Sequence, residues 1–133
     1  MANALQASFK QSLLGKLIDM DTDDIRVLLL DLADYTYSAA HDFLDDVAAG
    51  AIVATAVLAS LTIAAGVFDS ADGAFTAVTG DVSEGLFLYS HTGASDAARP
   101  LVAFYDTGVT GFPVTPNGGD INFTVHSSGW FAL

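Results

Sequence analysis

The chain of 133 residues has no cysteine, so disulfides and cysteine-based metal or nucleophile chemistry are excluded. This absence fits assembly in a reducing cytoplasm. Basic residues are scarce as well, since four of them oppose 16 acidic ones and leave a formal net charge of −12. Such a surface repels nucleic acid and anionic lipid, so we expect protein partners. Glutamate is nearly missing, and the 15 aspartates favour turns between short elements.

Charge is absent from all 22 residues between Val47 and Phe68, a length that would span a bilayer. Only nine of them are Val, Ile, Leu or Phe, and both flanks are acidic without Lys, Arg, Trp or Tyr as anchors. The Val, Ile and Thr content favours two buried strands, at 51–58 and 61–68, over a membrane helix. We therefore expect no membrane association. The lack of polar positions predicts burial on both faces, within the domain or against a neighbouring subunit.

The remaining pattern predicts a single domain over residues 1–133 that is all-β. Apolar residues at helical spacing predict a short N-terminal helical arm over 1–18, and we expect the domain to stay folded when residues 2–14 are deleted. A short helix is also expected at 41–48. Turn residues separate apolar runs into short strands, which is typical of an antiparallel β-sandwich, of which a jelly roll is one form. The other expected strands cover 25–31, 74–79, 85–91, 100–105, 121–127 and 129–133.

The tripeptide Asp106-Thr107-Gly108 follows the apolar run Val102–Tyr105. Aspartic proteases present a catalytic carboxylate in this way, and a single copy would require a homodimer. Only 25 residues follow Gly108, which is too few for the flap and the later strands of that fold. We therefore interpret the tripeptide as a strand that ends in a turn, and we predict no catalytic residue and no enzymatic activity.

An acidic segment at 19–24 has Asp at alternate positions, as in a calcium-binding loop. The sixth and twelfth positions of such a loop need Gly and Glu, but here they hold Asp24 and Leu30. A calcium-binding hand is excluded, and a loose divalent-cation site remains an alternative to a solvated turn. Three histidines show no metal-ligand spacing, namely His41, His91 and His126. We predict no metal and no cofactor.

The segment 106–120 is an unusual loop because Phe112 and Pro113 are apolar within it. These side chains either fold back on the core or form a protein contact. If the chain assembles with other proteins, we expect contacts from Leu5, Phe9 and Leu13 on the arm and from Phe112 and Pro113 on this loop. Trp130 is expected in the core or in a subunit interface.

Several stretches stand out together: the opening MANALQASFKQSLLG, Asp31 with Ala33-Asp34-Tyr35-Thr36, Asp42-Phe43-Leu44-Asp45, Ala49-Gly50-Ala51, and Pro113 to Ile121. In these stretches the chain resembles a family of small virion structural proteins of tailed bacteriophages. They are colinear over nearly the whole chain, and none is a catalytic motif. The chain departs from the family between residues 52 and 68, where the family tends to have polar and charged residues.

The resemblance implies a non-enzymatic component of a phage particle, located in the virion and assembled in the host cytoplasm. The leading interpretation is a capsid decoration or cement protein that stabilises the head from outside. The alternative is a tail, baseplate or fibre-associated structural module. The partners expected from this are the major capsid protein or other virion proteins, with homo-oligomers of the chain itself.

Overall fold

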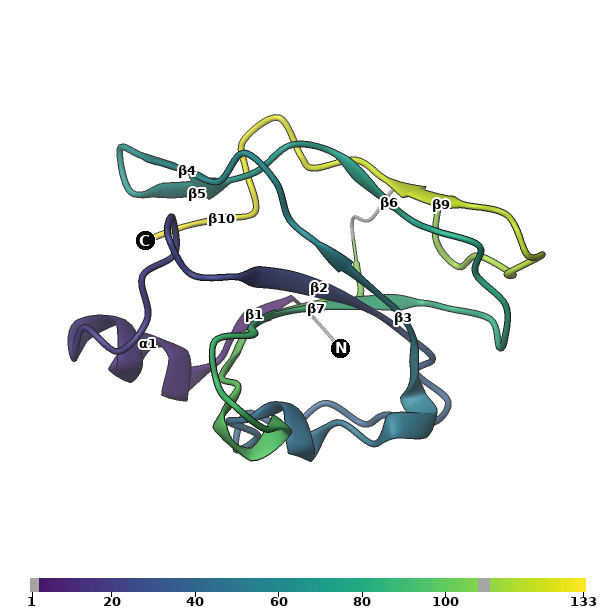
Figure 1. Ribbon diagram of the computed structural model, residues 1–133, viewed down its shortest axis with the longest axis horizontal. Helices are drawn as coiled ribbons and strands as arrows, with labels where there is room; N and C mark the ends of the chain where they lie inside the picture. Colours follow the sequence, from purple (N-terminus) through teal and green to yellow (C-terminus); the bar gives the residue numbers. More distant parts are fainter. Residues whose placement is uncertain (1–2, 108–110) are drawn as a thin grey trace.

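The computed structural model describes residues 3–107 and 111–133, which form antiparallel sheets and one α-helix (Figure 1). The prediction of an all-β fold with a short N-terminal helix is confirmed. The strands are β1 (Ala4–Leu5), β2 (Ile25–Leu30), β3 (Ile52–Val57), β4 (Thr62–Ala64), β5 (Val67–Asp69), β6 (Gly73–Phe75), β7 (Gly85–Ser90), β8 (Leu101–Tyr105), β9 (Ile121–Phe123) and β10 (Phe131–Ala132). The helix is α1 (Ala7–Leu14), and short 3-10 helices are η1 (Leu44–Asp46), η2 (Ala49–Ala51) and η3 (Asp96–Ala98).

The main sheet has five strands in the order β1-β8-β7-β2-β3. All six residues of β7 are buried, as are five of the six in β2, so the centre of this sheet is covered on both faces. Successive side chains of a strand point to opposite faces. Consequently Val27 and Leu29 enter one core, whereas Leu28 and Leu30 enter another.

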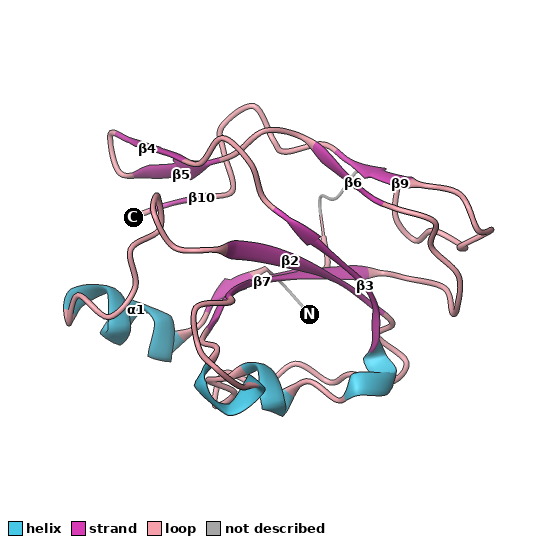
Figure 2. Ribbon diagram, viewed as in Figure 1, coloured by secondary structure: helices cyan, strands magenta, loops and turns pink. Residues whose placement is uncertain are grey.

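Different layers cover the two faces of the main sheet (Figure 2). On one side lie two small sheets, β10-β5-β4 and β6-β9, whose Phe68, Phe75 and Phe123 fill the larger core. On the other side lie the short 3-10 helices and the loops around them, which contribute Tyr35 and Leu44 to the second core. The arrangement is a sandwich with unequal layers.

The N-terminal segment is built into this fold and is not a separable arm. β1 pairs with β8, and the Gln6 N–H donates to the Val102 carbonyl at 3.0 Å. Phe9 in α1 is fully buried. The helix ends at Gly15 because the next residue, Lys16, has a left-handed φ of 61°. These contacts argue against the expectation that residues 2–14 can be deleted while the domain stays folded.

The uncharged run from Val47 to Phe68 differs from its prediction in two ways. The strand expected at 51–58 is confirmed as β3, but the one expected at 61–68 is instead the β4–β5 hairpin. Its two-residue turn, Ala65-Gly66, has φ values of 50° and 77°, which is the type I′ geometry of tight hairpins. The run is also not buried on both faces within the domain, because every residue of β4 is exposed. Burial against a neighbouring subunit stays a prediction. No helix in the described ranges has the length and apolar character needed to cross a bilayer.

Candidate assembly surface

Large apolar side chains that gather at the surface are a usual mark of a contact surface. The most exposed are Leu14 at 89%, Leu17 at 77% and Leu133 at 68%, followed by Val57 at 61%, Ile63 at 52% and Val82 at 42%. Figure 1 shows α1, the β4–β5 hairpin and the C-terminus at the same end of the molecule. We name this end the apolar end and define it by the four exposed residues that these segments carry or adjoin, Leu14, Leu17, Ile63 and Leu133.

Contacts between the chain ends hold the apolar end together. The Leu133 N–H donates to the Gly66 carbonyl at 2.9 Å, which ties the C-terminus to the hairpin turn. Phe131 meets Phe9 at 5.6 Å and Phe68 at 5.4 Å between ring centroids. The exposed leucines therefore stand on a packed base. A surface fixed in this way binds a partner without first having to become ordered.

Two open strand edges come from the same uncharged run. β3 is the last strand of the main sheet, and β4 is the last strand of the three-stranded sheet. Such edges present unpaired N–H and C=O groups to other chains, and proteins commonly protect them with charged residues or proline. Neither β3 nor β4 contains a charged residue or a proline. The run that the sequence marks as unusual thus supplies one edge strand of each of the two sheets without this protection.

The contact residues expected from the sequence are placed differently from the exposed ones. Phe9 is fully buried and is not available to a partner. Leu5 and Leu13 are partly buried against the larger core, and so is Phe112, while Pro113 is exposed. The helical spacing correctly predicts an apolar face, but that face covers the molecule's own core. Leu14 falls outside that face, and Leu17, whose spacing would continue the face, lies beyond the end of the helix after Lys16.

The expected contact loop at 106–120 includes residues 108–110, which lie outside the described residues. Its later part is tied to the rest of the chain. Ser83 and Val114 exchange two backbone hydrogen bonds of 2.9 Å, and the Asp120 carboxylate accepts the Ala77 N–H at 2.9 Å. Of the two interpretations weighed for Phe112, the described contacts favour folding back on the core. Trp130 also packs against this core, and its indole N–H donates to Ser70 Oγ at 2.8 Å.

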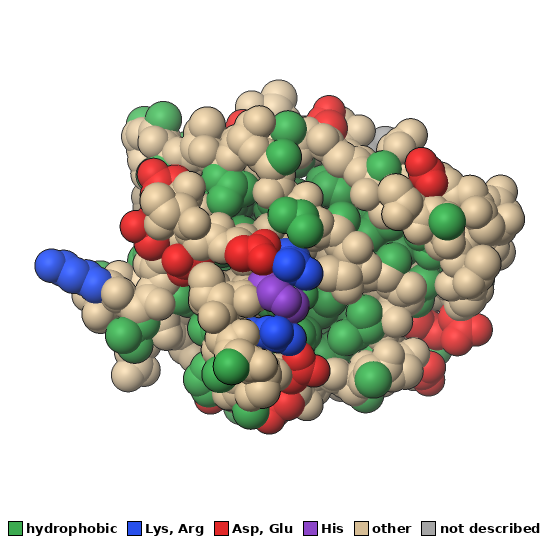
Figure 3. Space-filling view, viewed as in Figure 1, with side chains coloured by type: hydrophobic (Ala, Val, Ile, Leu, Met, Phe, Trp, Pro, Cys, Tyr) green, Lys and Arg blue, Asp and Glu red, His purple; other side chains and the backbone are tan. Residues whose placement is uncertain are grey.

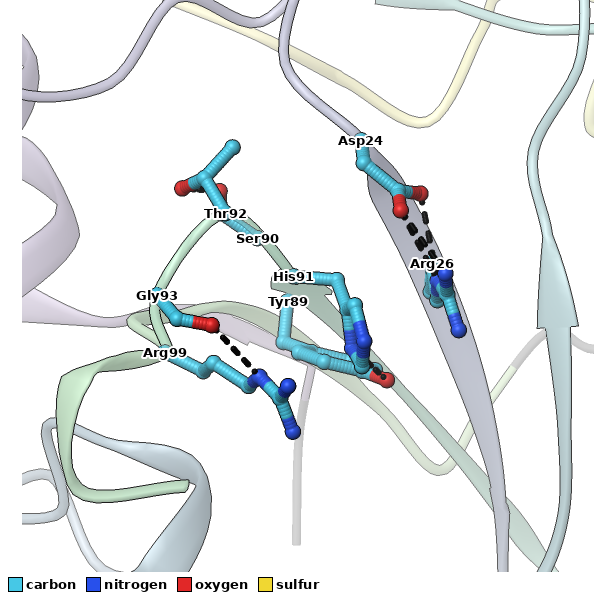
Figure 4. A network of polar contacts seen from close by, with 8 residues as sticks. All are labelled: Asp24, Arg26, Tyr89, Ser90, His91, Thr92, Gly93 and Arg99. Carbon is cyan, nitrogen blue, oxygen red and sulfur yellow. Dashed lines mark hydrogen bonds and ion pairs between the residues drawn. The ribbon is translucent and has the colours of Figure 1, made fainter. Parts of the chain in front are cut away.

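Two of the four basic residues gather at one place on the face drawn in Figure 3, beside a histidine. Figure 4 shows that Arg26 points at Asp24 and that Arg99 reaches back to the Gly93 carbonyl. The Arg26–Asp24 pair has a shortest distance of 2.8 Å, and Arg99 also pairs with Asp96 at 3.0 Å. Each guanidinium is thus matched by an aspartate of the same chain. The Asp24–Arg26 pair lies at the start of β2 and the Arg99 contacts lie within the loop at 91–99, while the His91 N–H donates to the Asp24 carbonyl at 2.8 Å and joins the two segments.

The contacts within this network shift the pKa values of Asp24, His91 and Tyr89. The Arg26 guanidinium hydrogen-bonds the Asp24 carboxylate and lowers the pKa of that carboxyl below its usual value. Burial, followed by the charges of Arg26 and Arg99, lowers the pKa of His91. Burial raises the pKa of Tyr89, whose hydroxyl lies 3.0 Å from His91 Nδ1. A protonated phenol beside a neutral imidazole is a stable pair at neutral pH. Sequence reasoning missed this network because its members come from separate elements.

Three carboxylates converge elsewhere, with one oxygen each from Asp31, Asp34 and Asp81 within 4.8 Å of one another. Asp31 Oδ1 already accepts the Ala33 N–H at 2.8 Å. Exposed acidic groups commonly meet without binding an ion, so this cluster by itself does not define a metal centre.

In the acidic loop at 19–24, the Asp23 carboxylate accepts the Asp19 N–H at 3.0 Å.

A groove with a volume of about 400 Å³ runs between the end of β8 and the C-terminal segment. Tyr105, Trp130 and Phe131 line it, and a second hollow of about 320 Å³ continues it along β1. Two of its polar side chains, Tyr105 and Asn3, bond within the chain. The Tyr105 hydroxyl donates to the Trp130 carbonyl at 2.7 Å, and Asn3 Oδ1 accepts the Asp106 N–H at 2.8 Å. The Tyr105 bond joins the end of β8 to the C-terminal segment, and the Asn3 bond joins the start of the chain to the residue after β8.

The three histidines each have a different hydrogen-bond partner. His41 Nδ1 lies 2.7 Å from the Tyr35 hydroxyl, and His126 Nδ1 accepts the Ser128 N–H at 3.0 Å. His91 pairs with Tyr89, as described above.

Asp106 and Thr107 follow β8 as expected, and their N–H groups both donate to Asn3 Oδ1, at 2.8 and 3.1 Å.

Comparison with models of protein families found no family that matches this chain. Comparison with curated proteins found no match either.

Proposed function

We propose that this protein is a non-enzymatic structural component of a tailed-bacteriophage particle and that it decorates the outside of the head. In this role it cements the shell by binding the major capsid protein. The observation that carries the proposal is the exposed apolar end on a strongly acidic domain. The resemblance of the chain to small virion structural proteins of tailed phages supports the same role.

Charge favours the outer surface of the head. A chain with a net charge of −12 is repelled by packaged DNA, whereas on the outside it faces solvent and the shell. The apolar end supplies the attraction, because each square ångström of apolar surface removed from water contributes about 25 cal/mol before the cost of association. Leu14 and Leu17 stand out furthest, so they contribute most to this contact.

The contact is tested by adding the purified protein to shells prepared without it and measuring bound protein after sedimentation. We expect a double variant, Leu14→Asp with Leu17→Asp, to lose most of the binding while its thermal unfolding stays near that of the parent. A matched control is Val82→Asp, which adds charge at an exposed apolar residue outside the apolar end. Equal binding by all three proteins would overturn the proposed contact.

A tail, baseplate or fibre module is the second candidate, because an exposed apolar surface also suits assembly there. The electrostatic argument against facing DNA applies specifically to the head. The two roles differ in copy number, since a decoration protein is present in hundreds of copies and a tail component in far fewer.

A further inference from the structure

The amino-acid sequence of the edge strand β3 is the same in both directions over five residues. Its residues Val53-Ala54-Thr55-Ala56-Val57 form a palindrome centred on Thr55. Two antiparallel copies of β3 aligned at Thr55 therefore place every residue opposite an identical one. Thr55 faces Thr55 of the second copy, and Val53 faces Val57. We propose that two copies of this chain pair edge to edge through β3 and join their main sheets into one.

The backbone of β3 has hydrogen-bonding groups in the right places for this pairing. The Leu58 N–H donates to the Ile25 carbonyl at 3.0 Å, so Leu58 is a hydrogen-bonded position toward β2. Hydrogen-bonded and non-bonded positions alternate along an antiparallel strand. Ala54 and Ala56 therefore also bond toward β2, while Thr55 and Val57 turn their N–H and C=O groups to the open edge. Among the described strands, only β2 pairs with β3.

Burial along β3 agrees with an unpartnered edge. Thr55 and Val57 are exposed, and none of the six residues is fully buried. A bulge opposite Leu29 and Leu30 skips Val53, at the start of the palindrome, so the central part of the strand stays regular. β3 is also the longest open edge, since β1 has two residues and β4 has three.

Charge favours a second copy over another kind of partner. Two chains that each carry −12 repel one another unless they meet where neither is charged. β3 lies in the middle of the 22-residue uncharged run and meets this condition. A basic partner would instead be drawn to the acidic surface. Pairing centred on Thr55 makes the two threonines a hydrogen-bonded pair and places their side chains in direct contact across the two-fold axis.

The register is tested with single cysteines, since the chain has none of its own. Directly opposed residues of a hydrogen-bonded pair have Cα atoms about 5.5 Å apart, within the roughly 4.4–6.8 Å that a disulfide spans. We expect Thr55→Cys to form a disulfide-linked dimer on mild oxidation. Val57→Cys is the matched control, because the two copies of residue 57 would lie about 14 Å apart.

A second measurement uses the protein without cysteine. Sedimentation equilibrium should give twice the 13.8 kDa of the chain at high concentration. Thr55→Lys should weaken association at least tenfold, because it places two positive charges next to each other at the two-fold axis. This loss is expected even though the substitution makes the net charge of each chain less negative. Ala94→Lys makes the same change in charge at an exposed loop residue and should leave association intact.

Selective linkage through Thr55→Cys, with a parent-like melting temperature under reducing conditions, supports the pairing. Linkage of Val57→Cys as fast as Thr55→Cys, or no linkage of either, overturns it. The inference concerns the isolated protein, so it does not depend on the proposed role in a particle and its failure leaves that role untouched.

Discussion

The ring of Phe9 in α1 meets the ring of Phe131 in β10 edge-on, with centroids 5.6 Å apart and planes at 76°. The two residues are separated by nearly the whole chain, yet they share the larger core. Phe131 also stacks on Phe68, which pairs with Ile63 in the hairpin. The first helix, the hairpin and the last strand are therefore one packed unit, and the apolar end depends on it.

Replacing Phe9 with alanine should destabilise the protein by about 3–5 kcal/mol, because the side chain is fully buried and leaves a cavity. This loss is a large part of the total stability of a typical domain, and urea unfolding measures it. The control Leu14→Ala removes a side chain that is 89% exposed and should change stability by less than about 0.5 kcal/mol. Equal unfolding midpoints for the two variants would contradict the packing described here.

Two glycines with the same backbone conformation should respond differently to alanine. Gly129 and Gly118 have φ values of 87° and 88°, but only at Gly129 would a Cβ lie 2.8 Å from the Phe68 carbonyl oxygen. Around Gly118 there is open space. Both variants incur the left-handed cost of roughly 1–2 kcal/mol, and Gly129→Ala incurs the clash as well. Thermal unfolding should show a clearly lower melting temperature for Gly129→Ala, and similar values for both would argue against this contact.

The hairpin turn offers a stabilising change. Ala65 has a φ of 50°, a conformation that costs alanine energy and that asparagine tolerates better. Since Asn-Gly is the favoured sequence for a type I′ turn, Ala65→Asn should raise stability by up to about 1 kcal/mol. Differential scanning calorimetry checks this result, with Ala71→Asn as an exposed control that lacks a positive φ. A lower melting temperature for Ala65→Asn would mean that the turn has another geometry.

The Asp24–Arg26 pair should make stability depend on pH. Because the pKa of Asp24 is lower in the folded protein, the pair stabilises the fold above about pH 4 and loses its effect as the pH falls through the lowered value. Both side chains are partly exposed, so Asp24→Asn should cost only about 0.2–1 kcal/mol at pH 7. Urea unfolding at pH 7 and near pH 3 should show this cost shrinking in acid and in high salt. A cost that is the same at both pH values would contradict the assignment.

Strands with long apolar runs are predictable from the sequence, and β2, β7 and β8 lie close to the ranges expected for them. Both faces of these strands are covered, so their residues show the pattern typical of buried strands. The β4–β5 hairpin was missed because alanine at position 65 is not a usual turn residue for its conformation.

The candidate contact surface was harder to predict, since an apolar face on a helix does not reveal what covers it. The helical spacing that marks Phe9 is the same whether the side chain packs on its own core or on a partner. The lack of charge from Val47 to Phe68 is visible in the sequence. The solvent exposure of this run, however, depends on which strands lie at sheet edges. That information is set by strand order, which local patterns do not contain.

The most direct test of the proposed role is the number of copies of this protein per particle. Quantitative mass spectrometry of purified virions would compare it with the major capsid protein in the same sample. A decoration protein on the outside of the head predicts hundreds of copies, a number comparable with that of the major capsid protein. Absence from the virion, or presence in only a few copies, would contradict the assignment to the head.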